Sequence, residues 1–511
     1  MTRRLLPVLA AALLLPAALR AQNVYLYPNG SDTALAIPVG GTRATYLYGV
    51  ASGGVSSYSI TVFFDTALTR IVRADSVPGY GLAAPTVTPI ANGATLIGSG
   101  TGTGFGGFLA QLTFEMKATA TTGTLLSLRV NQWTTQAGAS VAPWTLITDI
   151  TNGCLSRVLW GDPDSSLTVT GRDALIALTS AVQLPVNGFD LAVADVDADL
   201  AVTSRDALLM LSYAVSGTPY YYYERTGIPV AGVCAPLAGV PGDLAFRRGI
   251  SGGLYRVPAG DSIAIAIPQT TTFGEIGHLV RWSPDGTRVL ASAYTQAYYA
   301  EPVAITLSSG SQDTLARNAA YDAGGSYSPD GSRIAFFSDR AAPYLWVMDA
   351  NGANPARMQS AVTVTNYTST NPAWSPNGAR VAFTGYQTCC TSGLWTVLVA
   401  DSTVRLEYPI TSSVQPLHPF WSPAGDSIAF STTNGQIYAV SAPDTVTVPR
   451  AAVTLYGSLD LAGWTDAGIV FRRRRATSSP ATYDYYLQQP DGRILRVYRA
   501  AGTDDVGGSV R

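Results

Sequence analysis

Four aspartates fall within one stretch of twelve residues, in a chain of which only 13% is charged. The stretch, residues 195–206, reads DVDADLAVTSRD and carries carboxylates at its positions 1, 3, 5 and 12. Carboxylates this close repel one another unless a cation offsets their charge. A calcium ion takes about six to eight oxygen ligands, and positions 1, 3, 5, 7, 9 and 12 of a tight loop can supply them. The spacing therefore predicts a calcium site.

This loop has a second copy 33 residues earlier. Residues 162–182 read DPDSSLTVTGRDALIALTSAV and align with residues 195–215, which read DVDADLAVTSRDALLMLSYAV. In each copy a polar loop leads into an apolar, helix-like run, and the valine at loop position 8 (Val169, Val202) is expected to pack inward. The predicted calcium ligands are Asp162, Asp164, Ser166, the carbonyl of Thr168, Thr170 and Asp173 in the first copy, and Asp195, Asp197, Asp199, the carbonyl of Ala201, Thr203 and Asp206 in the second.

The two predicted sites differ in charge at loop position 5, which is Ser166 in the first copy and Asp199 in the second. We therefore expect the second site to bind calcium more tightly. The alternative is a pair of helices whose aspartate-rich caps hold no metal.

Residues 156–219 resemble the dockerin module, which has two calcium loops, each followed by a single helix, and an aspartate at position 12. Leu167 and Leu200 depart from that pattern, because position 6 is usually glycine. The resemblance implies a cohesin as the partner and contacts from loop positions 10 and 11. Those positions are Gly171, Arg172, Ser204 and Arg205 here. The alternative for the two arginines is that each only pairs with a nearby aspartate.

Residues 22–155 are rich in Thr, Ser, Gly and Val, with apolar runs between short turn signals, as is typical of a β-sandwich. Tyr58, Ile60, Val62 and Phe64 alternate within residues 57–72 and predict a half-buried strand, and residues 106–130 read as two more strands. The segments FFDTALTRIV and LAQLTFEMKATATTGT are similar to cohesin domains, which are jelly-roll sandwiches with relatives among carbohydrate-binding modules. This resemblance implies docking of the dockerin-like module on the chain's own cohesin-like domain, within one chain or between chains. A generic adhesin-like sandwich is the alternative.

A second repeat fills residues 243–500. The segments RWSPDGTRVLAS, SYSPDGSRIAFFS, AWSPNGARVAFTG and FWSPAGDSIAFST begin at residues 281, 326, 373 and 420. Ser-Pro-Asp-Gly suits a type I turn, the aromatic residue before it can pack between sheets, and a period in the forties indicates a β-propeller. These repeats resemble TolB-like propellers with WD-like repeats. Recurring strand ends predict six blades, with residues 501–511 left as a tail.

The ends and joints of the chain carry further signals. Residues 1–21, a basic MTRR followed by LLPVLAAALLLPAAL, predict a secretory signal peptide and hence an extracellular or periplasmic protein, with a membrane anchor as the alternative. No later segment is long and apolar enough to span a bilayer. In an oxidising compartment Cys154 and Cys234 are candidates for a disulfide. Residues 220–242 are expected to form a linker.

The fold class expected is mainly β and multidomain: a jelly-roll-like β-sandwich, a small α dockerin-like calcium module and a six-bladed β-propeller. A balance of 32 basic and 34 acidic residues argues against a nucleic-acid partner. The chain has no G-x-S-x-G, HExxH or P-loop motif, and both His278 and His418 belong to propeller repeats.

These signals favour a secreted, non-catalytic, calcium-dependent interaction or scaffold protein, whose propeller binds a protein, peptide or glycan. The basic run FRRRR at residues 471–475 is either a patch for an acidic glycan or anionic peptide, or a solvated hairpin end. The main alternative is a polysaccharide-degrading enzyme, a glycoside hydrolase or lyase, that carries the dockerin-like module beside a catalytic propeller.

Overall fold

The computed structural model divides the chain into two compact units, Met1–Pro236 and Leu237–Arg511, and each is described by itself. The predicted signal peptide, His278, Asp199, Ala201 and Cys234 lie outside the described residues. The structure describes residues 23–27, 34–37, 40–103, 106–120, 124–142, 147–148, 154–156, 159–164, 166, 168–186, 193–197, 202–217, 226, 238–248, 253–268, 280–296, 299–315, 320–365, 370–387, 391–410, 414–441, 450–453, 459–474, 483–499 and 505–511.

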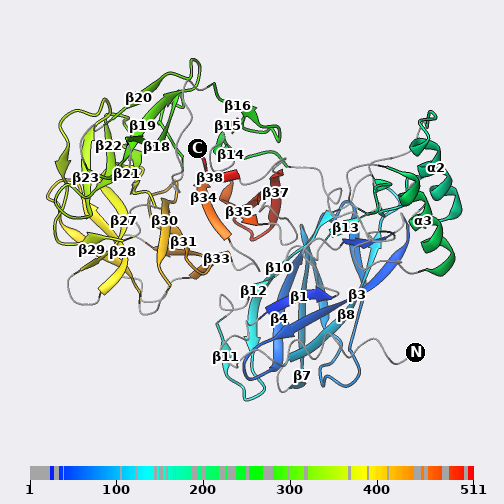
Figure 1. Cartoon of the computed structure of the whole chain (residues 1–511). Coiled ribbons are helices and arrows are strands. Elements are labelled where there is room, and N and C mark those ends of the chain that lie inside the picture. The colour runs from blue at the N-terminus through cyan, green and yellow to red at the C-terminus, as the bar shows by residue number, and fades with distance from the viewer. Residues whose placement is uncertain are drawn as a thin grey trace. The chain divides into compact units, whose positions relative to one another are not determined.

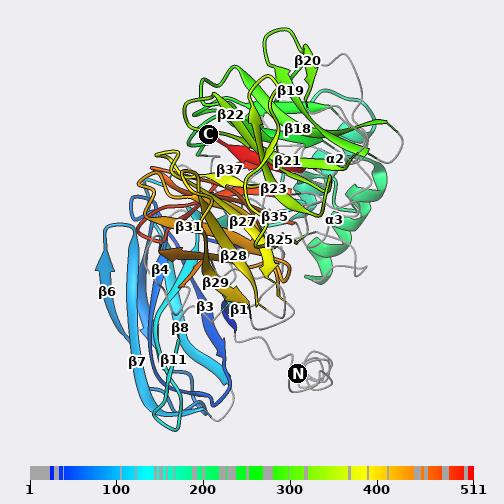
Figure 2. The ribbon, with the colours of Figure 1, turned by 90° about the vertical axis from the view of Figure 1, so that its left-hand side faces the viewer.

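Two five-stranded sheets form the first part of the N-terminal unit. One has the order β12-β1-β3-β8-β5 and the other the order β11-β10-β4-β7-β6, and the long strands of the second lie side by side in Figure 2. A small third sheet has the order β2-β13-β9. The strands are β1 (Asn23–Tyr27), β2 (Ala34–Ala36), β3 (Thr42–Val50), β4 (Val55–Phe63), β5 (Thr69–Asp75), β6 (Thr86–Ile90), β7 (Gly93–Thr103), β8 (Gly106–Met116), β9 (Thr124–Leu125), β10 (Ser127–Thr134), β11 (Ser140–Val141), β12 (Ile147–Thr148) and β13 (Cys154–Ser156).

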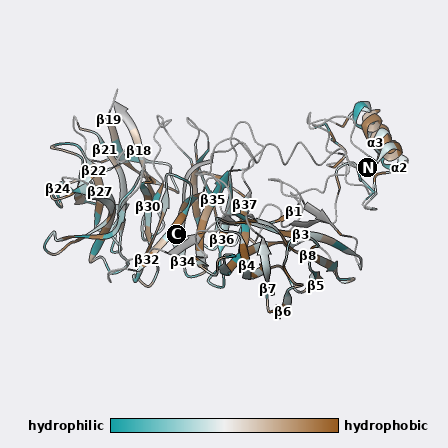
Figure 3. Ribbon diagram, turned by 90° about the horizontal axis from the view of Figure 1, so that it is seen from below, coloured by the Kyte–Doolittle hydropathy of each residue, from teal (hydrophilic) through white to brown (hydrophobic). Residues whose placement is uncertain are grey.

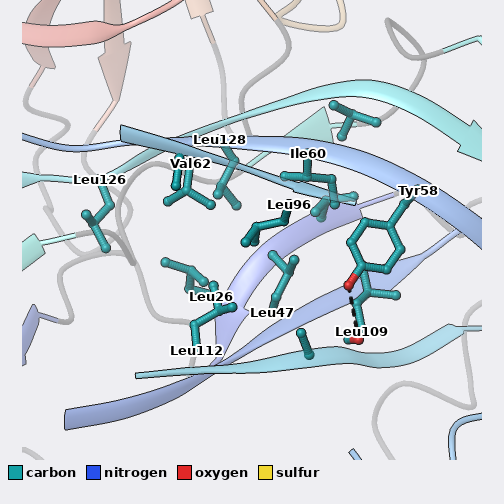
Figure 4. Packing of buried hydrophobic residues seen from close by; sticks show 14 of the residues in the cluster. Leu26, Leu47, Tyr58, Ile60, Val62, Leu96, Leu109, Leu112, Leu126 and Leu128 are labelled. Atoms are coloured by element: carbon teal, nitrogen blue, oxygen red, sulfur yellow. Dashed lines mark hydrogen bonds between the residues drawn. The ribbon is translucent and has the colours of Figure 1, made fainter. Parts of the chain in front are cut away.

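The two large sheets share one apolar core (Figure 4). Tyr58, Ile60 and Val62 of β4 are buried in it, as predicted, but Thr61 and Phe63 are buried as well, so the C-terminal half of the strand is covered on both faces. Leu47 of β3 and Leu112 of β8 meet them from the opposite sheet. The Tyr58 hydroxyl donates a 3.2 Å hydrogen bond to the carbonyl of Leu109, so a polar tie joins β4 to β8 inside the core.

Two helices, α2 (Gly171–Ala181) and α3 (Ser204–Ser216), follow the sandwich and pack on each other (Figure 1). Val169 and Val202 pack against the small core between the helices, as predicted for loop position 8. Within the linker predicted at residues 220–242, Thr226 is only 1% exposed and lies beside Gly161, and most of the other linker residues lie outside the described part of the chain. Among the described residues, no helix is both long and apolar enough to cross a membrane.

Six sheets make up the C-terminal unit. From the innermost strand outward, five of them have the orders β38-β14-β15-β16, β17-β18-β19-β20, β21-β22-β23-β24, β30-β31-β32-β33 and β34-β35-β36-β37, and the remaining one joins β25 and β26 to β27-β28-β29. The bounds are β14 (Leu244–Arg248), β15 (Leu254–Val257), β16 (Ile265–Ala266), β17 (Arg281–Trp282), β18 (Arg288–Gln296), β19 (Tyr299–Thr306), β20 (Gln312–Thr314), β21 (Asp322–Tyr327), β22 (Arg333–Ser338), β23 (Tyr344–Asp349), β24 (Ala356–Arg357), β25 (Thr363–Val364), β26 (Ala373–Trp374), β27 (Arg380–Gln387), β28 (Thr391–Leu398), β29 (Val404–Ile410), β30 (Pro416–Trp421), β31 (Ser427–Thr432), β32 (Ile437–Ser441), β33 (Arg450–Val453), β34 (Leu459–Thr465), β35 (Gly468–Arg474), β36 (Tyr483–Gln488), β37 (Ile494–Arg499) and β38 (Asp505–Val510).

The six sheets close into a ring around their innermost strands. Each of β17, β21, β26, β30, β34 and β38 contacts the next, and β38 contacts β17 again. The number of sheets confirms the six blades predicted from the repeat.

The tail expected at residues 501–511 is wrong, because Asp505–Val510 forms β38 and pairs with β14 (Figure 1). The first blade takes its inner strand from the C-terminus, so the propeller extends past residue 500. The sequence contained a sign of this arrangement, because the first repeat is incomplete and has no innermost strand of its own before β14.

The aromatic residue of each repeated turn packs between neighbouring sheets, as the sequence predicts. In three of the four turns this residue is a tryptophan, whose indole N–H donates to a backbone carbonyl on the inner strand of the preceding sheet: Trp282 to Ser509, Trp374 to Ser326 and Trp421 to Ala373, at 3.0–3.1 Å. The remaining turn has Tyr327 at this place. Each indole therefore satisfies its polar atom while its ring fills the space between blades.

Candidate metal-binding loops and helix face

Each acidic loop brings three carboxylates to one point. Carboxylate oxygens of Asp162, Asp164 and Asp173 lie within 4.8 Å of one another, and so do those of Asp195, Asp197 and Asp206. The position-1 aspartate of the first loop and the position-12 aspartates of both loops are fully buried. Buried carboxylates at this spacing need hydrogen-bond donors or a cation to offset their charge.

The first loop adds neutral oxygens to its carboxylates. The Ser166 hydroxyl oxygen lies 3.3 Å from Oδ1 of Asp162 and 3.0 Å from the carbonyl oxygen of Thr168. Loop positions 1, 3, 5, 7 and 12 therefore meet, and this mixture of carboxylate, hydroxyl and carbonyl oxygens suits calcium. The residues present fit the ion. In the second loop, positions 5 and 7 lie outside the described residues, so the fit there rests on the three carboxylates.

The position-9 threonines cap the helices. The hydroxyl of Thr170 donates to Oδ2 of Asp173 at 2.8 Å and accepts from the backbone N–H of Arg172. Thr203 makes the same contacts with Asp206 and Arg205. Both form capping boxes, which satisfy backbone donors at the helix start. If the loop held an ion, a hydroxyl engaged in this way could contribute through a water, which is a common arrangement at position 9.

The electrostatics of the first loop are those of a crowded acidic site. Burial, together with the charge of Asp164, raises the pKa of Asp173, although hydrogen bonds from Thr170 oppose this. Burial also raises the pKa of Asp164, but hydrogen bonds with Ser166 and Asp162 and the charge of Arg172 outweigh it and lower that pKa overall. A cation bound between these two aspartates would offset the charge of both.

The arginines at loop position 11 face the acidic clusters. Nε of Arg172 lies 3.5 Å from Oδ2 of Asp164, and Nε of Arg205 lies 3.2 Å from Oδ2 of Asp197. These are the contacts expected under the alternative that each arginine pairs with a nearby aspartate. Both arginine side chains remain more than half exposed, and Gly171 and Ser204 at position 10 are exposed as well. The four residues predicted to contact a partner therefore lie at the surface.

Both helices expose large apolar residues at equivalent positions. On α2, Leu175 is 62% exposed, Leu178 40% and Val182, at its C-terminal end, 58%. Adding 33 to each number gives residues of α3 that are exposed as well: Leu208 at 65%, Leu211 at 46% and Val215 at 85%. Figure 3 shows hydrophobic residues along both helices. We call these six side chains the helix face. The 33-residue repeat contained the signal, but sequence reasoning singled out only the loop residues.

Two arginines of the predicted basic run, Arg472 and Arg473, are buried, and Nε of Arg472 donates to Asp460 at 3.0 Å. These two arginines therefore fit neither a ligand-binding patch nor a solvated hairpin end, whereas Arg474 is exposed and Arg475 lies outside the described residues. His418 is also buried and lies 3.8 Å from Asp460, and burial lowers its pKa to about 4. These residues pack between blades.

The disulfide predicted between Cys154 and Cys234 lies outside the described side chains, although the backbone of Cys154 is in β13. It stays a prediction.

Comparison with known proteins concerns mainly the propeller. A TolB from Acinetobacter baumannii is similar at 13% identity and TM-score 0.41, over 76% of this chain and 80% of its own. A protein assigned as a TolB in Agrobacterium tumefaciens has 15% identity and TM-score 0.39, over 52% and 90%. The sixth cohesin of scaffoldin B from Acetivibrio cellulolyticus, solved with a Cel5 dockerin, has 15% identity and TM-score 0.19, over 24% and 91%. Residues 268–465 match the family described as "TolB beta propeller domain". The C-terminal unit therefore carries a TolB-like β-propeller domain.

Proposed function

We propose that this chain is a secreted, calcium-dependent docking protein. Its two loops and two helices form a dockerin-like module that attaches the chain to a cohesin-type jelly-roll sandwich, its own or that of another protein. The TolB-like propeller serves as a binding domain for a second, extracellular or periplasmic partner.

The observation that carries the proposal is the duplication of the helix face. Leu175 and Leu208, and the two pairs that follow them, are apolar, exposed and 33 residues apart. Large exposed apolar side chains that cluster on one element mark interaction sites. The three exposed apolar residues of each helix follow directly after an acidic loop. A ligand that orders the loop would therefore also order the start of the helix that carries them.

Calcium, when bound, supplies positive charge that offsets the clustered carboxylates. Asp162, Asp164, Ser166, Thr168 and Asp173 hold it in the first loop, and the three clustered aspartates of the second loop hold it there. Because Asp173 and Asp206 also accept from the N-caps of α2 and α3, they link the loop interior to each helix start. The loops therefore hold the two helices in register for docking.

The test is association of the full chain with itself and with purified cohesin modules, measured by sedimentation and biolayer interferometry. We expect binding in calcium and its loss in excess chelator. Leu208→Asp is expected to weaken binding at least about tenfold, because a leucine that becomes buried contributes about 1.5–3 kcal/mol. Ile263→Asp is the matched control, since Ile263 is 68% exposed but lies in the propeller.

Equal binding with and without chelator, or equal loss in the two variants, contradicts the docking proposal. The polysaccharide-degrading alternative makes a separate prediction, namely that the full chain releases reducing or unsaturated ends from a polysaccharide. An activity screen on such substrates distinguishes the two functions, because Leu208→Asp leaves a catalytic propeller unchanged.

A further inference from the structure

The innermost strands of the propeller surround a cavity of about 630 Å³. Every blade contributes to its wall, through Arg281, Tyr327, Trp374, Trp421, Trp464 and Arg511. A volume of this size is typical of sites that take a small molecule, and such sites are mostly apolar with a few placed polar groups. The cavity lies wholly within the C-terminal unit, so it is independent of the calcium loops.

Arg281 breaks the pattern of the repeat at this cavity. It occupies the position just before the turn aromatic, where the next three repeats have Ser326, Ala373 and Phe420. All four equivalent residues line the cavity. An arginine where the other repeats are small or apolar has no explanation in the packing of a blade.

The Arg281 side chain reaches across the ring to strand β30, the innermost strand of the sheet β30-β31-β32-β33. Its guanidinium lies 3.7 Å from the ring centre of Phe420 and donates to the carbonyl of Pro419 at 3.1 Å. The side chain is only 7% exposed, and no carboxylate among the described residues forms an ion pair with it. A guanidinium buried in this way carries a desolvation cost that one carbonyl and one ring do not offset. Burial lowers the pKa of Arg281 to about 9.

Two donors on adjacent strands point to what completes the site. Nε of Arg281 and the hydroxyl of Ser326 are buried in the cavity wall without a hydrogen-bond partner among the described residues. Both groups donate, and the guanidinium carries a positive charge, so the complementary group is an anion with paired oxygens. Ala373, Phe420 and the indoles around them offer an apolar surface beside it. Asp466 is the one acid among the wall residues, and the wall also holds Arg281 and Arg511.

We propose that this cavity binds a small organic carboxylate, with Arg281 and Ser326 holding the carboxylate and the aromatic wall holding the apolar body of the ligand. The inference rests on the proposed binding role of the propeller and names its ligand class. It involves no residue of the calcium loops or the helix face, so its failure leaves calcium-dependent docking unaffected.

The experiment titrates the full chain with phenylacetate and galacturonate, and with their neutral counterparts phenylacetamide and galactose, by calorimetry and ligand-observed NMR. We expect at least one carboxylate to bind in a saturable way and its neutral counterpart to bind at least about tenfold more weakly, since charge-assisted hydrogen bonds are the stronger ones. Arg281→Met is expected to abolish that preference. Arg288→Met is the control, because Arg288 belongs to the adjacent strand β18 but pairs with Asp313 at the surface.

Two further readouts separate ligand binding from a structural role. Replacing a buried charge by an apolar side chain is often neutral or stabilising, so Arg281→Met should keep or raise the melting temperature while binding is lost. Ser326→Ala is a small change and should weaken carboxylate binding about two- to tenfold with the fold intact. The proposal is overturned if no carboxylate binds at about 10 mM, if carboxylates and neutral counterparts bind equally, or if Ser326→Ala and Arg281→Met both bind like the wild type.

Discussion

The arginines at loop position 11 occupy an unusual place for a partner-binding residue. Arg205 lies at the surface, yet its Nε is 3.2 Å from a carboxylate oxygen of Asp197, a predicted calcium ligand. Arg172 stands in the same relation to Asp164. If the loop binds calcium as proposed, the cation and the arginine would compete for the same carboxylate, and the guanidinium would be free for a partner.

Arg205→Ala therefore has opposite effects on two measurements. Calcium affinity should rise about two- to fivefold, because a competing and repelling charge is removed, and the pair is exposed enough for the effect to stay small. Docking to a cohesin-type partner should weaken. Calorimetry with calcium and interferometry with the partner measure the two effects. A variant in which both affinities fall together contradicts the competition.

At the scale of elements, the repeated propeller turns share one hydrogen-bond pattern. The hydroxyl of Ser328 is buried, accepts from the backbone N–H of Arg333 at 2.9 Å and contacts Oδ1 of Asp330. Hydrogen bonds from Ser328 and Ser332 lower the pKa of Asp330 to about 2. The next blade makes the same contacts with Ser375 and Asn377, so an amide serves where the other turn has a carboxylate.

Ser328→Ala should lower the free energy of unfolding of the propeller by about 1–3 kcal/mol, because a buried N–H loses its acceptor. Asp330→Asn should change it little at neutral pH, since Asn377 already fills that place one blade later. Thermal and denaturant unfolding of both variants gives the comparison. A larger loss for Asp330→Asn than for Ser328→Ala contradicts this account of the turn.

Local signals predicted most of the elements. The strand β4, the turn repeat of the propeller and the inward valines of the loops are all encoded by neighbouring residues, and the structure confirms them. The exposed second face predicted for β4 is not seen at Thr61 and Phe63, which are buried. Features that depend on residues far apart were missed. The pairing of β38 with β14 joins residues about 260 positions apart, and burial of Arg472 depends on the ring being closed. No local pattern reports either of these.

The residues of the candidate sites also fall into those that a local pattern predicts and those that depend on distant parts of the chain. The loop aspartates could be predicted because their spacing is itself the signal. The helix face could have been found by comparing the apolar residues of the two helical segments at a shift of 33 residues. Arg281 could not be recognised, because its contacts on β30, and the cavity that it shares with Ser326 of β21, form only when six blades surround one axis.

For the whole molecule, closure of the propeller depends on the last residues of the chain. Val510 is buried and lies against Gly463 of β34, where any side chain in place of the glycine would collide with it. The innermost strand of the first blade is thus held by its own sheet on one side and by the sixth blade on the other. A ring that closes in this way loses its cooperativity when the closing strand is removed.

Deletion of residues 505–511 should therefore open the ring and lower the melting temperature of the propeller by well over 10 °C. For a domain of this size, such a shift corresponds to a loss of about 5 kcal/mol in the free energy of unfolding. Differential scanning calorimetry measures the change, with calcium-dependent docking of the same variant as the control for the other unit. A dispensable tail predicts an unchanged transition, and that result contradicts closure by β38.

The most direct test of the central claim, that calcium organises the acidic loops, is a calorimetric calcium titration of the full chain and of two single variants. We predict two bound ions, with Asp195→Asn removing the tighter one and Asp162→Asn the weaker one. The docking measurements should lose affinity in the same order. If the wild type binds no calcium, or if neither substitution changes the titration, the loops are helix caps without a metal and the account is wrong.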